Sequence, residues 1–72
     1  MRVYVNAAPV DVAAGASALD CVRAWQEEEA AAVESGRRTI TDSRGLPTEA
    51  AATAYSGAIY RTVSGRSSAA HD

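Results

Sequence analysis

The chain has 72 residues with a formal net charge of −2 at pH 7, and its length allows one domain with a single small core. All seven basic residues are arginines against nine acidic residues, so the charge gives no general attraction to nucleic acid or to anionic membranes. A single cysteine, no membrane-spanning apolar run and a strand-like N-terminus in place of a secretion signal favour a reducing, cytoplasmic location.

The N-terminal residues are predicted to form a β-hairpin. Two alternating segments, RVYV and VDV, flank NAAP, and a turn at residues 6–9 would put four valines on one face: Val3, Val5, Val10 and Val12. Pro9 has no amide hydrogen for a strand ladder. It is therefore expected in the turn or at the first position of the second strand, which must be an edge strand there.

A capped helix is predicted to follow and to lie across the valine face. Ser17 and Asp20 have capping-box spacing, and such a cap contributes about 1 kcal/mol. Four residues then recur at helical spacing on one face: Ala18, Cys21, Val22 and Trp25. The next stretch, EEEAAAVESG, either continues this helix or forms a second short one to about Ser35, with Gly36 as the residue after its end. We favour a break near Glu28.

The second half of the chain predicts two strands separated by loops. RRTIT at residues 37–41 is a short strand candidate, and DSRG suits a type I turn. LPTEAAATAY is ambiguous between a helical turn at Pro47 and a loop, and Ser56-Gly57 is a turn. The last strand is predicted over residues 59–63. Alternation puts Ile59, Arg61 and Val63 on one face, so a bulge or an arginine at the sheet rim is expected.

No residue type in the chain predicts catalysis, a metal site or a cofactor. Cys21, on the apolar helix face, is expected to be a buried small hydrophobe rather than a nucleophile. Ser67, Ser68, His71 and Asp72 contain the residue types of a hydrolase triad, but a polar terminal tail cannot hold them rigidly. His71 beside Asp72 has no further metal ligand at workable spacing.

Together the elements predict an α+β fold of the β-grasp type over residues 1–64, followed by a flexible tail at 65–72. This fold has an N-terminal hairpin and one main helix packed on a mixed four-stranded sheet. The residues alone would also allow a split α+β sandwich. The stretch MRVYVNAAPVDVAAGASALDCVRAW resembles the opening of ThiS/MoaD-like sulfur-carrier proteins, and YSGAIYRTVSG is similar to the last strand of this family and its exit into the tail.

The resemblance implies a carrier mechanism that depends on the tail. Family members end in Gly-Gly; a partner enzyme adenylates the terminal carboxylate with ATP, and sulfur replaces AMP to give a thiocarboxylate. Here Gly65 stands alone before Arg66, so Ser64 and Gly65 would form the carrier end only after cleavage behind Gly65. In this family the terminal glycines have no Cβ, so the extended backbone can pass through the narrow channel of the adenylating enzyme.

The alternative from the same resemblance is a protein-interaction module that has lost carrier activity. Its docking surface would be the outer sheet face with Tyr4, Tyr60, Arg61 and Arg66. Five arginines would lie near one another if the third strand neighbours the last one: Arg37, Arg38, Arg44, Arg61 and Arg66. They form either a solvated sheet edge or a docking patch for an acidic partner. Both hypotheses predict a protein partner and no nucleic-acid or membrane partner.

Overall fold

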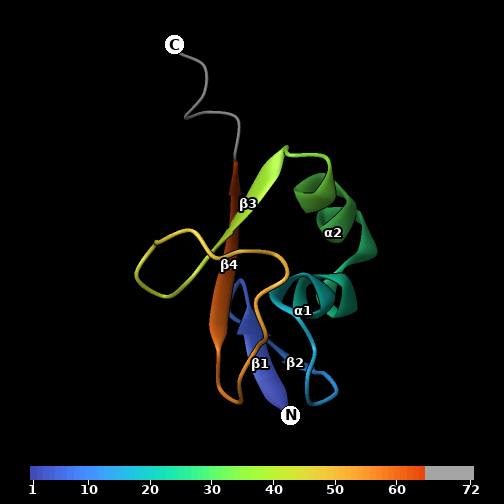
Figure 1. The fold of residues 1–72 in the computed structure, drawn as a ribbon, viewed down its shortest axis with the longest axis vertical. Helices are drawn as coiled ribbons and strands as arrows, with labels where there is room; N and C mark the ends of the chain where they lie inside the picture. Colours follow the sequence, from blue (N-terminus) through green and yellow to red (C-terminus); the bar gives the residue numbers. More distant parts are fainter. Residues whose placement is uncertain (65–72) are drawn as a thin grey trace.

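The computed structural model describes residues 1–64, and the predicted tail, with Gly65 and Arg66, lies outside the described residues. Six elements follow one another: β1 (Arg2–Val5), β2 (Ala8–Asp11), α1 (Ala18–Trp25), α2 (Glu27–Glu34), β3 (Arg38–Thr41) and β4 (Ile59–Ser64). The strands form one mixed four-stranded sheet in the order β2-β1-β4-β3 (Figure 1). Its central pair, β1 and β4, is parallel, and both outer pairs are antiparallel. The predicted α+β class and mixed sheet are confirmed, and the arrangement is compatible with a β-grasp.

Both helices cover the same side of the sheet (Figure 1). α1 packs against β1 and β2, whereas α2 packs against β3. The expectation of one main helix is wrong, because residues 1–64 contain two helices of eight residues each, and the alternative of a second short helix that ends near Ser35 is confirmed. Within residues 1–64, neither helix has the length and apolarity that crossing a lipid bilayer requires.

The break between the helices lies at Gln26, two residues before the predicted position. Gln26 has an extended backbone with φ −153° and ψ 126°. Its N–H still donates to the Val22 carbonyl over 2.8 Å, and its carbonyl accepts from the Ala30 N–H over 3.2 Å. The same residue therefore ends α1 and begins α2 without leaving its own backbone groups unpaired.

The hairpin turn is shorter than predicted. Asn6 and Ala7 have φ values of 50° and 71°, and Val5 pairs directly with Ala8. Positive φ at both central residues is the pattern of a type I′ turn, whose twist matches that of the flanking strands. Ala8 and Pro9 thus belong to β2, where Pro9 pairs with Tyr4. Because β2 is an edge strand, the missing N–H of Pro9 removes no ladder bond.

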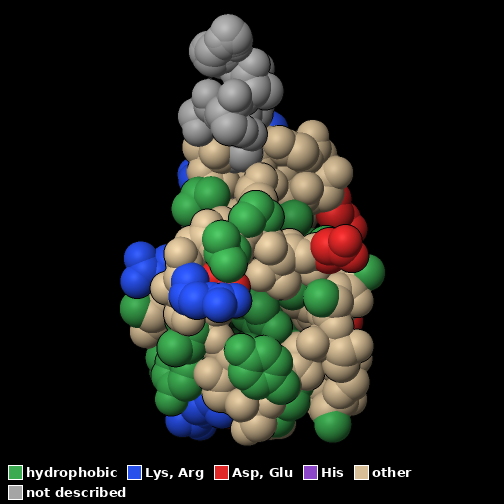
Figure 2. Space-filling view, turned by 60° about the vertical axis from the view of Figure 1, so that its left-hand side comes forward, with side chains coloured by type: hydrophobic (Ala, Val, Ile, Leu, Met, Phe, Trp, Pro, Cys, Tyr) green, Lys and Arg blue, Asp and Glu red, His purple; other side chains and the backbone are tan. Residues whose placement is uncertain are grey.

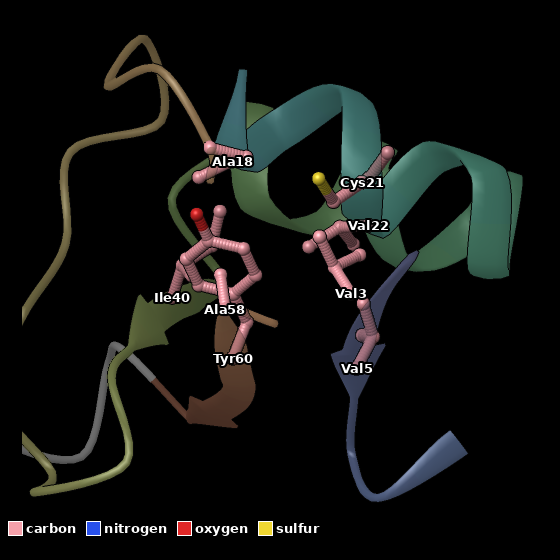
Figure 3. Packing of buried hydrophobic residues seen from close by; sticks show 10 residues of the cluster. Val3, Val5, Ala18, Cys21, Val22, Ile40, Ala58 and Tyr60 are labelled. Atoms are coloured by element: carbon pink, nitrogen blue, oxygen red, sulfur yellow. The ribbon is translucent and has the colours of Figure 1, made fainter. Parts of the chain in front are cut away.

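The predicted capping box of α1 is confirmed, and it orients the buried helix face. The Ser17 hydroxyl accepts from the Asp20 N–H over 3.1 Å, and the Asp20 carboxylate accepts from the Ser17 N–H over 3.1 Å. Trp25 is half-buried at the margin of the core. Figure 3 shows the centre of the core, where helix and strand side chains meet: Val3, Val5, Cys21, Val22, Ile40, Ala58 and Tyr60.

The loops between β3 and β4 close the fold without a helix. Gly45 donates its N–H to the Asp42 carbonyl over 3.0 Å, which confirms the predicted turn. The helical alternative at Pro47 is wrong, because Pro47 forms an isolated bridge with Thr41. A second predicted turn is confirmed where the Ala58 N–H donates to the Tyr55 carbonyl over 3.0 Å, with Gly57 at φ 85° between them.

Candidate functional site

The candidate site is the sheet face opposite the helices, which we call the outer face. It consists of alternating residues from three neighbouring strands: Tyr4, Pro9, Ile59, Arg61 and Val63. Tyr4 is directly opposite both Pro9 and Ile59, so these three side chains form a row across the sheet. Tyr4, Ile59 and Val63 are 37%, 43% and 42% exposed. Figure 2, which brings the left-hand side of Figure 1 forward, shows hydrophobic and basic side chains beside one another on this side of the molecule.

The alternation of β4 explains why apolar residues lie on this face. Ala58 and Tyr60 are 1% and 4% exposed, so the inward positions are occupied by a small residue and a tyrosine ring. Ile59, Arg61 and Val63 consequently point outward. The register between β3 and β4 runs without interruption from Arg38 to Thr41, so the expected bulge is not formed.

The placement of Tyr60 on the outer face, predicted from the sequence, is wrong. Tyr60 is the Cα partner of Val5 and packs in the core beside Ile40 and Ala58 (Figure 3). In a chain without phenylalanine, its ring supplies volume that the core otherwise lacks. Burial raises the pKa of its hydroxyl above the ordinary value.

The remaining predicted site residues divide between described and undescribed parts of the chain. Tyr4 and Arg61 lie on the outer face as expected. Ser64 ends β4 opposite Arg38. Gly65 and Arg66 lie outside the described residues, so the carrier end and one arginine of the docking prediction are not described.

The predicted arginine patch is divided by ion pairs. β3 does neighbour β4, but Arg38 shares the inward face with Ile40 and places its Nε 3.4 Å from Glu29 Oε2 on α2. Arg44 pairs with Asp42 over 3.3 Å, and Arg2 pairs with Asp11 over 3.1 Å. Arg37 instead donates to the Ser35 hydroxyl over 2.9 Å. Arg2, Arg38 and Arg44 are thus each paired with a carboxylate.

Arg61 differs from them. Within residues 1–64, its guanidinium has no ion-pair or hydrogen-bond partner, whereas every other arginine of this part has a side-chain partner. It lines a shallow hollow beside the hairpin turn together with Asn6 and Ala7. This places an unneutralised positive charge next to the exposed Ile59 and Val63.

A polar network holds Asn6, one of the residues that line this hollow, and sequence reasoning missed it. Asn6 Nδ2 donates to Thr62 Oγ1 over 2.9 Å, and Asn6 Oδ1 accepts from the Thr62 N–H over 3.1 Å. Thr62 Oγ1 in turn donates to Glu29 Oε2 over 2.9 Å. Asn6 was expected only as a turn residue, and no local pattern connects it with residues on β4 and α2.

The described residues offer little for chemistry. No group of three or more potential metal ligands occurs among residues 1–64. Cys21 is fully buried, as predicted, and this burial raises the pKa of its thiol. Comparison of the chain with family models, with curated proteins and with solved structures found no match. Among residues 1–64, the outer face combines exposed apolar side chains with the unpaired Arg61.

Proposed function

We propose that the chain is a protein-interaction module of the β-grasp type, which binds a protein partner through its outer face and performs no reaction of its own. The observation that supports it is the exposure of Tyr4, Ile59 and Val63 on adjacent strands of one sheet face. Contiguous apolar side chains with a polar surround are typical of interaction surfaces. Fully burying one such side chain contributes about 1.5–3 kcal/mol, so covering three half-exposed ones favours association.

The sheet edges favour contact through side chains rather than through an added strand. On β2, Pro9 has no N–H to offer to an incoming strand. On β3, the Ile40 carbonyl already accepts from the Thr48 N–H over 2.8 Å, and the Asp42 N–H donates to Leu46 over 2.9 Å. A partner would thus meet the outer face more readily than an open edge.

Site-specific photo-cross-linking tests this proposal. A benzophenone amino acid replaces Ile59 on the outer face, and in a control protein it replaces Ala24, which is exposed on α1. In the native cells we expect a discrete cross-linked protein from position 59 and none from position 24. Adding the Val63→Glu substitution should abolish the cross-link. Equal cross-linking from both positions would contradict docking at this face.

The second candidate function is the sulfur carrier. It is supported by the position of β4, a central strand parallel to β1 that ends at Ser64, directly before Gly65 in the sequence. In this proposal, cleavage behind Gly65 frees a carboxylate, an adenylating enzyme converts it with ATP to the acyl adenylate, and a sulfur donor displaces AMP.

Intact-mass measurement after co-expression with an adenylating enzyme tests the carrier function. A product that ends at Gly65 and is heavier by the exchange of one oxygen for sulfur would support it. A Gly65→Ala control should reduce that product. Recovery of only the chain ending at Asp72 would contradict it.

A further inference from the structure

The positive charge of the outer face is concentrated at one residue. Asp11 on β2 and Asp42 after β3 are both already paired, with Arg2 and with Arg44. Five of the nine acidic residues lie on the helices: Asp20, Glu27, Glu28, Glu29 and Glu34. Within residues 1–64, Arg61 therefore has no carboxylate partner, while five carboxylates lie on the helices.

The surroundings of Arg61 combine a charge with apolar contacts. Ile59 and Val63 flank it at alternate positions on the same strand, and both are more than two-fifths exposed, at 43% and 42%. On the other side, the hollow reaches Asn6 and Ala7 at the hairpin turn. The hydrogen bonds of Asn6 to Thr62 keep the wall of this hollow in place.

We infer that Arg61 and the hollow at Asn6 and Ala7 receive a carboxylate from the partner, presented by an acidic residue that is flanked by apolar residues. This inference rests on the proposed docking face and specifies its partner. A guanidinium offers paired N–H donors that match the two oxygens of a carboxylate, and such pairs are stronger than neutral hydrogen bonds. The apolar neighbours of the acidic residue would cover Ile59 and Val63.

A second copy of the chain fits this face less well. Two outer faces in contact would bring the Arg61 of each copy into one interface. Asp11, which lies on β2 opposite Arg2, would have to leave Arg2 in order to compensate. Charge complementarity thus favours an acidic partner segment over self-association.

Peptide selection on the intact protein tests the inference. A phage-displayed library of random peptides is selected on the immobilised full chain. We expect enriched peptides in which Asp or Glu stands next to Leu, Phe or Trp. One enriched peptide and its Asp→Asn or Glu→Gln counterpart are then synthesised and titrated against the wild-type chain. The amide counterpart should bind about tenfold more weakly, the loss expected for one charge-assisted pair.

Variants of the chain separate the carboxylate inference from the docking proposal. Arg61→Gln should weaken the acidic peptide about tenfold and leave the amide peptide within about twofold, whereas the matched control Arg2→Gln should change neither by more than about twofold. Unaltered melting temperatures confirm that both variants fold. If Arg61→Gln has no effect but Ile59→Glu abolishes binding, the carboxylate inference is overturned and the docking face stands.

The remaining outcomes are also decisive. If Ile59→Glu and Val63→Glu both leave the peptide bound, the docking face itself is overturned. A selection that enriches no acidic peptide overturns the carboxylate inference. Sedimentation of the wild-type chain as a dimer that Ile59→Glu dissociates would show that a second copy occupies the face instead.

Discussion

Asn6 holds Thr62 by two hydrogen bonds, one from its Nδ2 to Oγ1 over 2.9 Å and one from the Thr62 N–H to its Oδ1 over 3.1 Å. The two residues are 56 positions apart. Since Thr62 Oγ1 also donates to Glu29, the pair connects the hairpin turn with β4 and α2. In a domain with so small a core, a polar contact that joins three elements is a substantial part of what fixes their arrangement.

Asn6→Ala should destabilise the fold by about 2–4 kcal/mol. It removes both hydrogen bonds, and it places alanine at φ 50°, a left-handed conformation that asparagine adopts more readily. Asn6→Gly is the matched control, since glycine accepts positive φ but cannot bond to Thr62. We expect it to lose only about 1–2 kcal/mol. Urea unfolding gives both values. Equal losses in the two variants would show that the side-chain bonds, and not the turn conformation, carry the whole effect.

Ala7→Gly should stabilise the protein by about 0.5–1 kcal/mol. Ala7 has φ 71°, a conformation that is strained for alanine and natural for glycine, and the relief exceeds the entropy that glycine adds to the unfolded chain. Gly57→Ala should have the opposite sign, because Gly57 has φ 85° although nothing lies within 4 Å of an added Cβ. Thermal melting measures both. A lower melting temperature for Ala7→Gly would contradict the assignment of strain to this turn.

Two isoleucines on neighbouring strands distinguish the inner and outer sides of the sheet. Ile40 is 1% exposed, so Ile40→Ala should destabilise by about 2–4 kcal/mol through lost burial and a cavity. Ile59 is 43% exposed, so Ile59→Ala should change stability by less than about 1 kcal/mol. Chemical denaturation of both variants provides the comparison. Similar losses would mean that the outer face is part of the core.

Stability should decline at alkaline pH because two buried groups, the Cys21 thiol and the Tyr60 hydroxyl, resist losing their protons in the folded state. Burial raises the pKa of Cys21 and of Tyr60 above their ordinary values of 9.0 and 10.0. The unfolded chain therefore releases these protons at lower pH than the folded chain. The stabilisation is complete below the ordinary pKa values and is lost as the pH rises through the raised ones.

Tyr60→Phe should consequently flatten the alkaline decline of the free energy of unfolding. Tyr4→Phe is the matched control, since Tyr4 is 37% exposed and is not among the groups that raise the pKa of Tyr60, and it should leave the decline unchanged. Urea titrations at a series of pH values measure the slope. A slope that is identical in wild type and Tyr60→Phe would exclude Tyr60 as a contributor.

Local patterns were sufficient for much of the fold. Capping-box spacing located the start of α1 at Ser17, and alternation located β1 and β4. The missing N–H of Pro9 correctly indicated an edge strand as one of its two possible places. The length of the turn was wrong, because positive φ at Asn6 and Ala7 closes the hairpin with two residues instead of four.

The candidate site was predictable only in part. Tyr4 and Arg61 were expected on the outer face, and both lie there. Tyr60 was not expected in the core, because alternation gives two faces without saying which faces inward. That choice depends on the total volume available to fill the interior, here with no phenylalanine. The link between Asn6 and Thr62 has no local signal at all.

The parallel pairing of β1 and β4 also determines how the fold responds to mechanical force. The chain enters the sheet at one end of β1, and β4 ends toward the opposite end of the molecule (Figure 1). Tension between Met1 and Ser64 would therefore act along both strands. It would load the bonds from Tyr4 to Ala58 and from Asn6 to Tyr60 together, in shear, rather than opening them one after another. An unfoldase that pulls the domain into a narrow pore from the end of β4 should therefore unfold it slowly. The rate should be lower than the rate of thermal unfolding alone would suggest.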